Sequence, residues 1–318
     1  MKNFFISLLK ALGYFGIYLG AQFLVTFVYM FFASISVAGK YALGNYDLTD
    51  PLVFNQYMDE VTQLLLEASM PITILTGLLT VGIICLVFLC RKKKLAKELS
   101  FRKISGGTAL SAALMGFGFN YVLGLLFLFL PEEWISSYAE ASDAAFTGEF
   151  WIIAVAIVIM APLVEEIVFR GLIYTRLKKG MPVAAAAVIT AVWFGVMHGH
   201  PLWIAYAALF GLVMIWIFER TKSLFGSMAF HFGYNLLAAI SMALPENIPD
   251  WVGLVMLGVG VLASVVGVYW FLKIPKAVEV SESDETAILS ADAEAVPVTE
   301  EQVVVTEEKE EETTENFK

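Results

Sequence analysis

The sequence has 318 residues, of which 59% are hydrophobic and only 16% charged, and its mean hydropathy is +0.76. Ordinary soluble domains carry about a quarter charged residues, so this composition excludes a soluble globular protein and predicts a chain that lies in lipid. The formal net charge of −10 comes from the C-terminus, because residues 277–318 hold 14 acidic and 2 basic side chains. The rest of the chain lacks the strongly basic face that a nucleic-acid-binding protein needs, and we expect no nucleic-acid partner.

Eight apolar stretches have about the length of a membrane-spanning helix, since roughly 20 helical residues cross a hydrocarbon core of about 30 Å. The fifth is short and consists largely of alanine and valine. In chain order the stretches are residues 11–37, 71–90, 108–130, 150–173, 182–198, 202–219, 224–244 and 251–272. The predicted fold class is therefore all-α, a polytopic membrane helix bundle of about eight transmembrane helices.

The chain divides into four predicted regions. Residues 1–149 form an N-terminal membrane region with three spans and outer loops, residues 150–245 contain spans four to seven, and residues 246–276 contain the last span. Residues 277–318 are rich in Glu, Thr, Ser and Ala and cannot bury enough apolar surface to offset the loss of chain entropy on folding. We predict that they form a disordered acidic tail in the cytoplasm.

Lysine and arginine residues fall in every second loop between the predicted spans. With eight spans, four basic loops lie on one side of the membrane: residues 91–103, 176–179, 220–222 and 273–276. The loops on the other side together carry 12 acidic residues and one basic residue, Lys40. Because basic loops stay on the cytoplasmic side during insertion, we predict that both termini are cytoplasmic.

Three charged residues lie well inside a predicted span, and all three are in the fourth: Glu165, Glu166 and Arg170. A charge at the centre of a membrane helix costs at least about 2.5 to 3.5 kcal/mol, so such residues are functional candidates. Glu166 and Arg170 are four residues apart and predict an ion pair on one helical face, although a buried pair can also have a purely structural role. Glu165 is rotated by about 100° from Glu166, so we expect it to act separately, as a general base.

The three histidines are also placed in or beside apolar segments. His198 ends the fifth predicted span, four residues after Phe194, and His200 follows it at the outer end, where an interfacial role is expected. His231 lies four residues before Asn235 in the seventh span. That pair would present an imidazole and a carboxamide on one face, which suits stabilisation of an oxyanion.

These residues form three motifs on successive apolar helices: Glu165-Glu166-x-x-x-Arg170, Phe194-x-x-x-His198 and His231-x-x-x-Asn235. The pattern resembles the CPBP intramembrane protease family, also called Abi or CAAX-protease-like. That family includes the type 2 CAAX prenyl endopeptidases, lysostaphin resistance proteins and bacteriocin-processing or immunity proteins. The resemblance covers about residues 150–245, which would be the catalytic core, and no motif position departs from it.

The resemblance implies an endopeptidase that hydrolyses a peptide bond in a membrane-associated or lipidated substrate. Glu165 with His198 would activate the attacking water, and His231 with Asn235 would stabilise the tetrahedral intermediate. The ion pair of the first motif would hold the site in shape. A compact chain of this kind suggests a bacterial plasma membrane, where leader peptides or bacteriocins are the expected substrates.

A metal ion is an alternative in this family. Glu165, His198 and His231 would supply the three protein ligands of a catalytic zinc, but the H-E-x-x-H signature is absent from the sequence. We therefore expect a metal-independent glutamate mechanism that requires no cofactor.

Two functions of other classes remain open at this stage. A non-catalytic bacteriocin-immunity or scaffold protein would bind a peptide or a partner's membrane helix without cleaving it. A proton-coupled transporter would use the same glutamate and histidine side chains as a proton relay, although the sequence has no evident inverted repeat to favour it.

Overall fold

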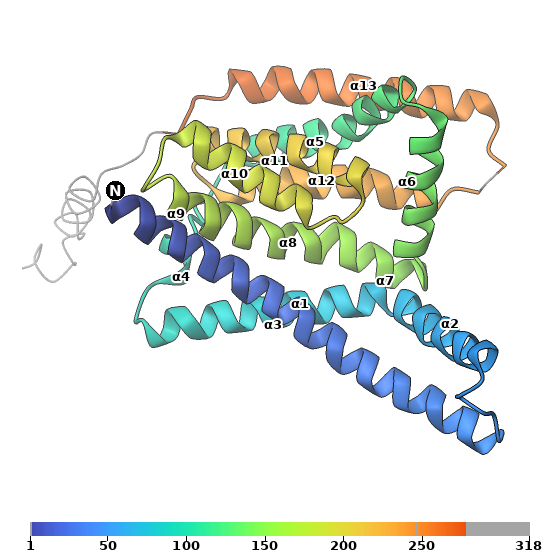
Figure 1. The fold of residues 1–318 in the computed structure, drawn as a ribbon. Helices are drawn as coiled ribbons and strands as arrows, with labels where there is room; N and C mark the ends of the chain where they lie inside the picture. The colour runs from blue at the N-terminus through green and yellow to red at the C-terminus, as the bar shows by residue number, and fades with distance from the viewer. Residues whose placement is uncertain (1, 246, 278–318) are drawn as a thin grey trace, which may run out of the picture. The chain divides into compact units, whose positions relative to one another are not determined.

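A computed structural model describes residues 2–245 and 247–277 (Figure 1). Every regular element within these two ranges is a helix, which confirms the all-α prediction for the described part of the chain. The predicted disorder of the acidic tail concerns residues 278–318, which lie outside the described residues.

All eight predicted spans lie in helices, and two further helices, α2 and α6, lie in the acidic loops between them. The elements in chain order are α1 (Lys2–Leu43), α2 (Pro51–Glu67), α3 (Ser69–Cys90), α4 (Leu95–Glu98), α5 (Gly106–Phe127), α6 (Glu132–Ala145), α7 (Phe150–Ala154), η1 (Val155–Met160), α8 (Ala161–Glu165), η2 (Glu166–Tyr174), α9 (Thr175–Leu177), α10 (Val183–Val196), α11 (Pro201–Thr221), α12 (Leu224–Met242) and α13 (Asp250–Lys273). The elements α7 to α9 continue one another as a single helix that corresponds to the fourth predicted span.

Within the described residues, six helical segments are long and apolar enough to cross a membrane: Lys2–Leu43, Ser69–Cys90, Gly106–Phe127, Phe150–Leu177, Pro201–Thr221 and Trp251–Lys273. The two other predicted spans do not meet these criteria. The helix α10 has 14 residues, or about 21 Å at 1.5 Å per residue, which is shorter than the hydrocarbon core. The helix α12 interrupts its apolar sequence with polar residues, among them His231 and Asn235.

The outer helices expose large apolar side chains. On α1 the exposed fractions of Phe23 and Phe27 are 72% and 70%, and on α13 that of Leu254 is 68%. A soluble monomer rarely leaves extended apolar surface in contact with water. These faces are suited to contact with lipid, as expected of an integral membrane protein.

The four basic loops meet at one end of the helices. Arg176 Nη2 lies 2.6 Å from Glu98 Oε2, which joins the second basic loop to the first. Lys178 Nζ lies 2.8 Å from Glu219 Oε1, next to the third basic loop. The guanidinium of Arg220 in that loop donates to a backbone carbonyl of the fourth at 2.8 Å. The arrangement agrees with the grouping of basic loops that the sequence predicts.

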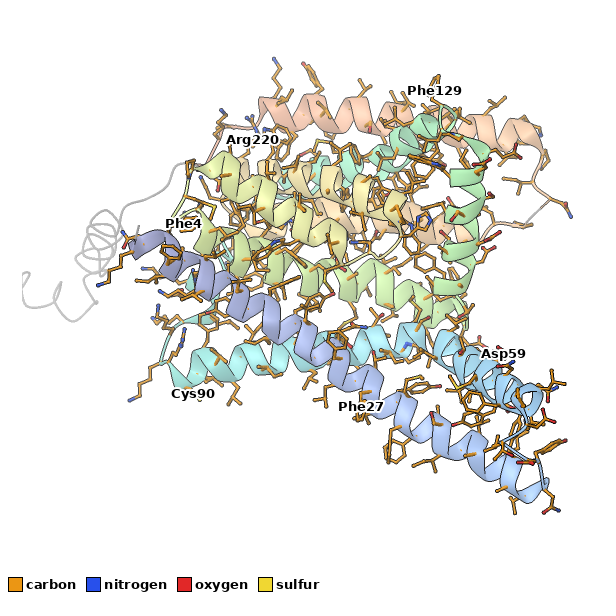
Figure 2. All side chains as sticks on the ribbon, viewed as in Figure 1. Phe4, Phe27, Asp59, Cys90, Phe129 and Arg220 are labelled. Carbon is orange, nitrogen blue, oxygen red and sulfur yellow. The ribbon has the colours of Figure 1, made fainter. Side chains whose placement is uncertain are left out.

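The opposite ends of the helices carry the acidic loops. Figure 2 shows Phe4, Cys90 and Arg220 at one end of the helices, and Asp59 and Phe129 at the other. Each long helix thus runs from the basic end to the acidic end or back. The basic loops and the acidic loops therefore lie at opposite ends of the helix axes.

Glycines allow close contact between the helices that carry the polar residues. A Cβ atom added to Gly116 of α5 would lie 1.8 Å from the carbonyl oxygen of Phe230 in α12, and one added to Gly233 of α12 would lie 2.0 Å from that of Ala113 in α5. Gly118 of α5 similarly approaches a backbone carbonyl of α13. Helices in lipid associate through such small residues because hydrophobic attraction between them is weak.

The composite helix Phe150–Leu177 lies at the centre of the helix bundle. It packs against α1 and α3 on one side and against α10 and α12 on the other (Figure 1). Its residues Val168, Leu172 and Ile173 are fully buried in the main apolar core. This central position brings the charged residues of the fourth span next to the fifth and seventh spans.

We predict that Gly116→Ala destabilises the protein, because the added methyl group would overlap a backbone carbonyl that has no room to move. The expected loss is about 1 to 3 kcal/mol, as for other overpacked interiors, and it should appear as a lower thermal unfolding midpoint in detergent. Gly124→Ala on the same helix is the matched control, since nothing lies within 4 Å of the added Cβ. Equal midpoints for the two variants would contradict the close α5–α12 contact.

We also predict an acid-dependent loss of stability at the basic end. Burial raises the pKa of Glu98, but the hydrogen bond from Lys93 and the charge of Arg176 outweigh this and lower the pKa below its ordinary value. The stabilisation is therefore present above the unfolded-state pKa and is lost as the pH falls through the lowered pKa of the folded state. Glu98→Gln should lower the unfolding midpoint at neutral pH, and the difference from the wild type should shrink towards pH 3; a difference independent of pH would argue against this contribution.

Candidate active site

The backbone of the fourth span changes its winding where the two glutamates lie. Glu165 is the last residue of α8, and Glu166 is the first residue of the π-helical segment η2, while η1 is a second π-helical segment one turn earlier. π-Helical turns are rare and are found frequently at functional sites. Here the change of winding falls between Glu165 and Glu166, and the two carboxylates have different surroundings.

Glu166 and Arg170 form the ion pair that their spacing predicts. Arg170 Nη1 donates to Glu166 Oε1 at 2.9 Å, and both side chains are fully buried. Arg170 Nη2 also donates to the backbone oxygen of Gly211 in α11 at 3.2 Å. The guanidinium carbon lies 4.5 Å from the centre of the Phe194 ring, a cation–π distance.

His231 lies between the two carboxylates. Its Nδ1 is 3.2 Å from Glu166 Oε1, and its Nε2 is 3.8 Å from Glu165 Oε2. A carboxylate paired with an arginine is ionised and can only accept hydrogen bonds, so we assign the Nδ1 hydrogen to the bond with Glu166. That bond fixes the ring, and Nε2 consequently faces Glu165.

Asn235 binds a backbone carbonyl that the fourth span leaves without a partner. Its Nδ2 donates to Ile157 O at 2.6 Å. The residue five positions later is Pro162, which has no N–H to close a π-helical hydrogen bond, and the N–H of Ala161 goes to Ala156 instead. An amide nitrogen carries two hydrogens, so the second can be donated to another acceptor.

His198 follows the C-terminal end of α10. Its Nδ1 donates to Phe194 O at 2.9 Å, so the lone pair is on Nε2. The Phe194 ring centre lies 5.0 Å from the His198 ring and 6.3 Å from the His231 ring. Both imidazoles therefore pack against the same aromatic ring, although in the described residues no hydrogen bond joins His198 to Glu165 or Glu166.

His200 has partners of its own at the start of α11. Its Nδ1 accepts from the backbone N–H of Leu202 at 3.3 Å, and its Nε2 lies 3.1 Å from Ser137 Oγ in α6. These contacts cap α11 and join it to α6 at the acidic end of the helices. They fit the interfacial role that the sequence predicts.

Glu165 is partly exposed and lines a small pocket. Its side chain retains 18% of its accessible surface. The pocket has a volume of about 20 Å³, and Tyr18 and Gln22 of α1 and Thr76 of α3 contribute to its walls. A volume of this size holds about one water molecule, and the lining offers polar partners to bind it.

The alternative metal ligands do not come together in the manner that a zinc ion requires. Over residues 2–245 and 247–277, no three side chains among His, Cys, Asp and Glu are grouped closely enough to hold a metal ion. Glu165 and His231 are neighbours, but His198 is not grouped with them closely enough to complete a three-ligand site among the described residues. The donor set Glu165, His198 and His231 therefore does not fit a three-ligand site in this conformation.

Sequence reasoning missed several groups around the site. The carbonyl of Gly211 and the ring of Phe210, whose centre is 5.1 Å from that of His231, gave no signal because backbone oxygens and core aromatics are common. Tyr18 and Gln22 lie on the first helix, far from the motifs in sequence. Pro162, three residues before Glu165, was a usable signal for an unsatisfied carbonyl in the same helix.

The fold and the site together define a polytopic helical membrane protein with a buried glutamate–arginine–histidine cluster. Residues 147–237 match the family model described as "Type II CAAX prenyl endopeptidase Rce1-like". The match covers the residues that carry the three motifs and confirms the resemblance to this protease family over that part of the chain. No curated protein and no solved structure matches the chain significantly.

We predict that Arg170→Met strongly destabilises the protein, because it leaves the carboxylate of Glu166 buried without its cation. Breaking one side of a buried ion pair costs about 3 to 5 kcal/mol, measurable by thermal or SDS-induced unfolding. The double variant Glu166→Gln/Arg170→Met removes both charges and should be more stable than Arg170→Met alone. A double variant as unstable as the sum of the two single variants would show that the charges do not interact.

Proposed function

We propose that the protein is an intramembrane endopeptidase that hydrolyses a peptide bond in a membrane-associated or lipidated peptide. The observation that carries this proposal is the position of Glu165. Its carboxylate is partly exposed, lines a pocket the size of one water molecule and lies 3.8 Å from Nε2 of the buried His231. A base thus adjoins a place for water, and a histidine outside that pocket lies next to the same base.

Glu165 acts as the general base in this proposal. It takes a proton from a water molecule, the water oxygen attacks the carbonyl carbon of the substrate, and the proton is then passed to the departing amine. His198 assists by accepting a hydrogen bond from the same water through Nε2, since its Nδ1 is held by Phe194. Small movements on substrate binding would bring His198 closer, because catalytic contacts often tighten in the complex.

His231 and Asn235 stabilise the oxyanion that forms on the carbonyl oxygen. In this proposal a hydrogen on Nε2 of His231 is donated to the oxyanion, and the amide of Asn235 donates its second hydrogen. Each donor of this kind contributes about 10²- to 10³-fold to the rate. Glu166 and Arg170 act indirectly, since they hold His231 in one orientation.

The protein spans the membrane eight times in this proposal. All eight long or apolar helices enter the bilayer, α10 and α12 being shielded by their neighbours, and both termini are cytoplasmic. The setting is a bacterial plasma membrane, with leader peptides or bacteriocins as substrates. The mechanism uses no metal ion or other cofactor.

We predict that Glu165→Gln lowers cleavage by about 10² to 10⁴-fold, the usual contribution of a general base, while the fold is preserved because Gln has the same shape. The measurement is digestion of a membrane-peptide library by the detergent-purified protein, with the cuts located by mass spectrometry. Glu140→Gln on the exposed face of α6 is the matched control and should cleave like the wild type.

Undiminished cleavage by Glu165→Gln would reject the assignment of the base. The rival functions give other outcomes. A non-catalytic immunity or scaffold protein would still protect cells when Glu165 is replaced, and a proton-coupled transporter would show uptake driven by a pH gradient in liposomes.

A further inference from the structure

A second polar pocket lies at the basic end of the helices, away from the glutamate–histidine cluster. Its volume is about 130 Å³, and it opens between the start of α1, the end of α3 and the residues around α9. Five cationic side chains and one carboxylate line it: Lys10, Arg91, Lys93, Arg176, Lys179 and Glu98.

The carboxylate in this pocket is already fully used. Glu98 Oε1 lies 2.6 Å from Lys93 Nζ, and Glu98 Oε2 lies 2.6 Å from Arg176 Nη2. The cations Lys10, Arg91 and Lys179 form no ion pair with any residue that the structure describes. The pocket therefore has an excess of positive charge and lacks an internal anion to balance it.

The pKa of Lys179 reflects this excess of positive charge. Burial lowers its pKa, and the charges of Arg176, Lys93 and Lys10 lower it further, while Glu98 opposes them only in part. An added anion would relieve this repulsion. Because the cations come from three separate helical segments, such an anion would also bridge those segments.

Apolar groups lie beside these cations. Tyr14 and Phe88, both buried and stacked with ring centres 6.3 Å apart, form part of the pocket wall. Leu9 precedes Lys10, and Leu89 lies two residues before Arg91; their exposed fractions are 68% and 73%. The pocket thus lies where the lipid-facing surfaces of α1 and α3 end.

We propose that this pocket binds the phosphate group of an anionic phospholipid, with the acyl chains along the exposed apolar faces of α1 and α3. Basic pockets between transmembrane helices on the cytoplasmic side bind acidic lipid headgroups, and arginine and lysine donate charge-assisted hydrogen bonds to phosphate oxygens. The exposed leucines favour a lipid over free phosphate as the source of the anion. This site does not depend on the proposed peptidase activity.

The test compares binding of short-chain phosphatidylglycerol, phosphatidylcholine of the same chain length and inorganic phosphate to the full chain in a nonionic detergent. The triple variant Lys10→Gln/Arg91→Gln/Lys179→Gln should bind phosphatidylglycerol at least about tenfold more weakly than the wild type, since it loses three cations that attract the acidic headgroup. Phosphatidylcholine and inorganic phosphate should bind weakly to every variant.

The triple variant Lys103→Gln/Lys273→Gln/Lys276→Gln is the matched control, because it removes three cations from the same end but leaves this pocket intact. A conservative variant, Lys10→Arg/Arg91→Lys/Lys179→Arg, should keep the affinity, because it keeps all three positive charges in the pocket. Equal losses in both glutamine variants would show diffuse attraction and overturn the proposal. Inorganic phosphate that binds as tightly as the lipid would show a free-anion site and would also overturn it.

Discussion

The arrangement of the whole protein depends on one ion pair buried inside its central helix. Glu166 and Arg170 are fully excluded from solvent, where an isolated charge would be strongly unfavourable. Three further contacts of the pair come from other helices. Gly211 provides a carbonyl, Phe194 an aromatic face and His231 an imidazole.

These partners also organise the catalytic groups of the proposed mechanism. Because His231 is bound to Glu166 on one side, its other nitrogen is directed towards Glu165. Phe194 lies under Arg170 and also receives the hydrogen bond of His198. A pair that is structural in itself thus fixes the positions of groups that can carry chemistry, and the two roles weighed for it do not exclude each other.

Lipid as the solvent explains the features around this centre. A backbone carbonyl inside the hydrocarbon has no water to bind, so the gap created by Pro162 is filled by Asn235. Helices that cannot rely on hydrophobic attraction approach through glycine, as α5 and α12 do at Gly116 and Gly233. Cations that the hydrocarbon excludes collect at one end, where they form the basic pocket.

The sequence by itself determined the membrane class, the helical positions, the grouping of the basic loops and the three motifs, because these follow from local hydropathy and from spacing along one helix. The Glu166–Arg170 pair could be predicted for the same reason. What the sequence could not decide is which groups from separate helices meet: the His231 contacts to both glutamates, the Gly211 carbonyl, and the pocket walls given by Tyr18 and Gln22. The helix of the fifth predicted span is also shorter than the sequence predicted, because composition does not show where a short helix ends. Such contacts join residues far apart in the chain, and only the packing of the helices in three dimensions brings them together.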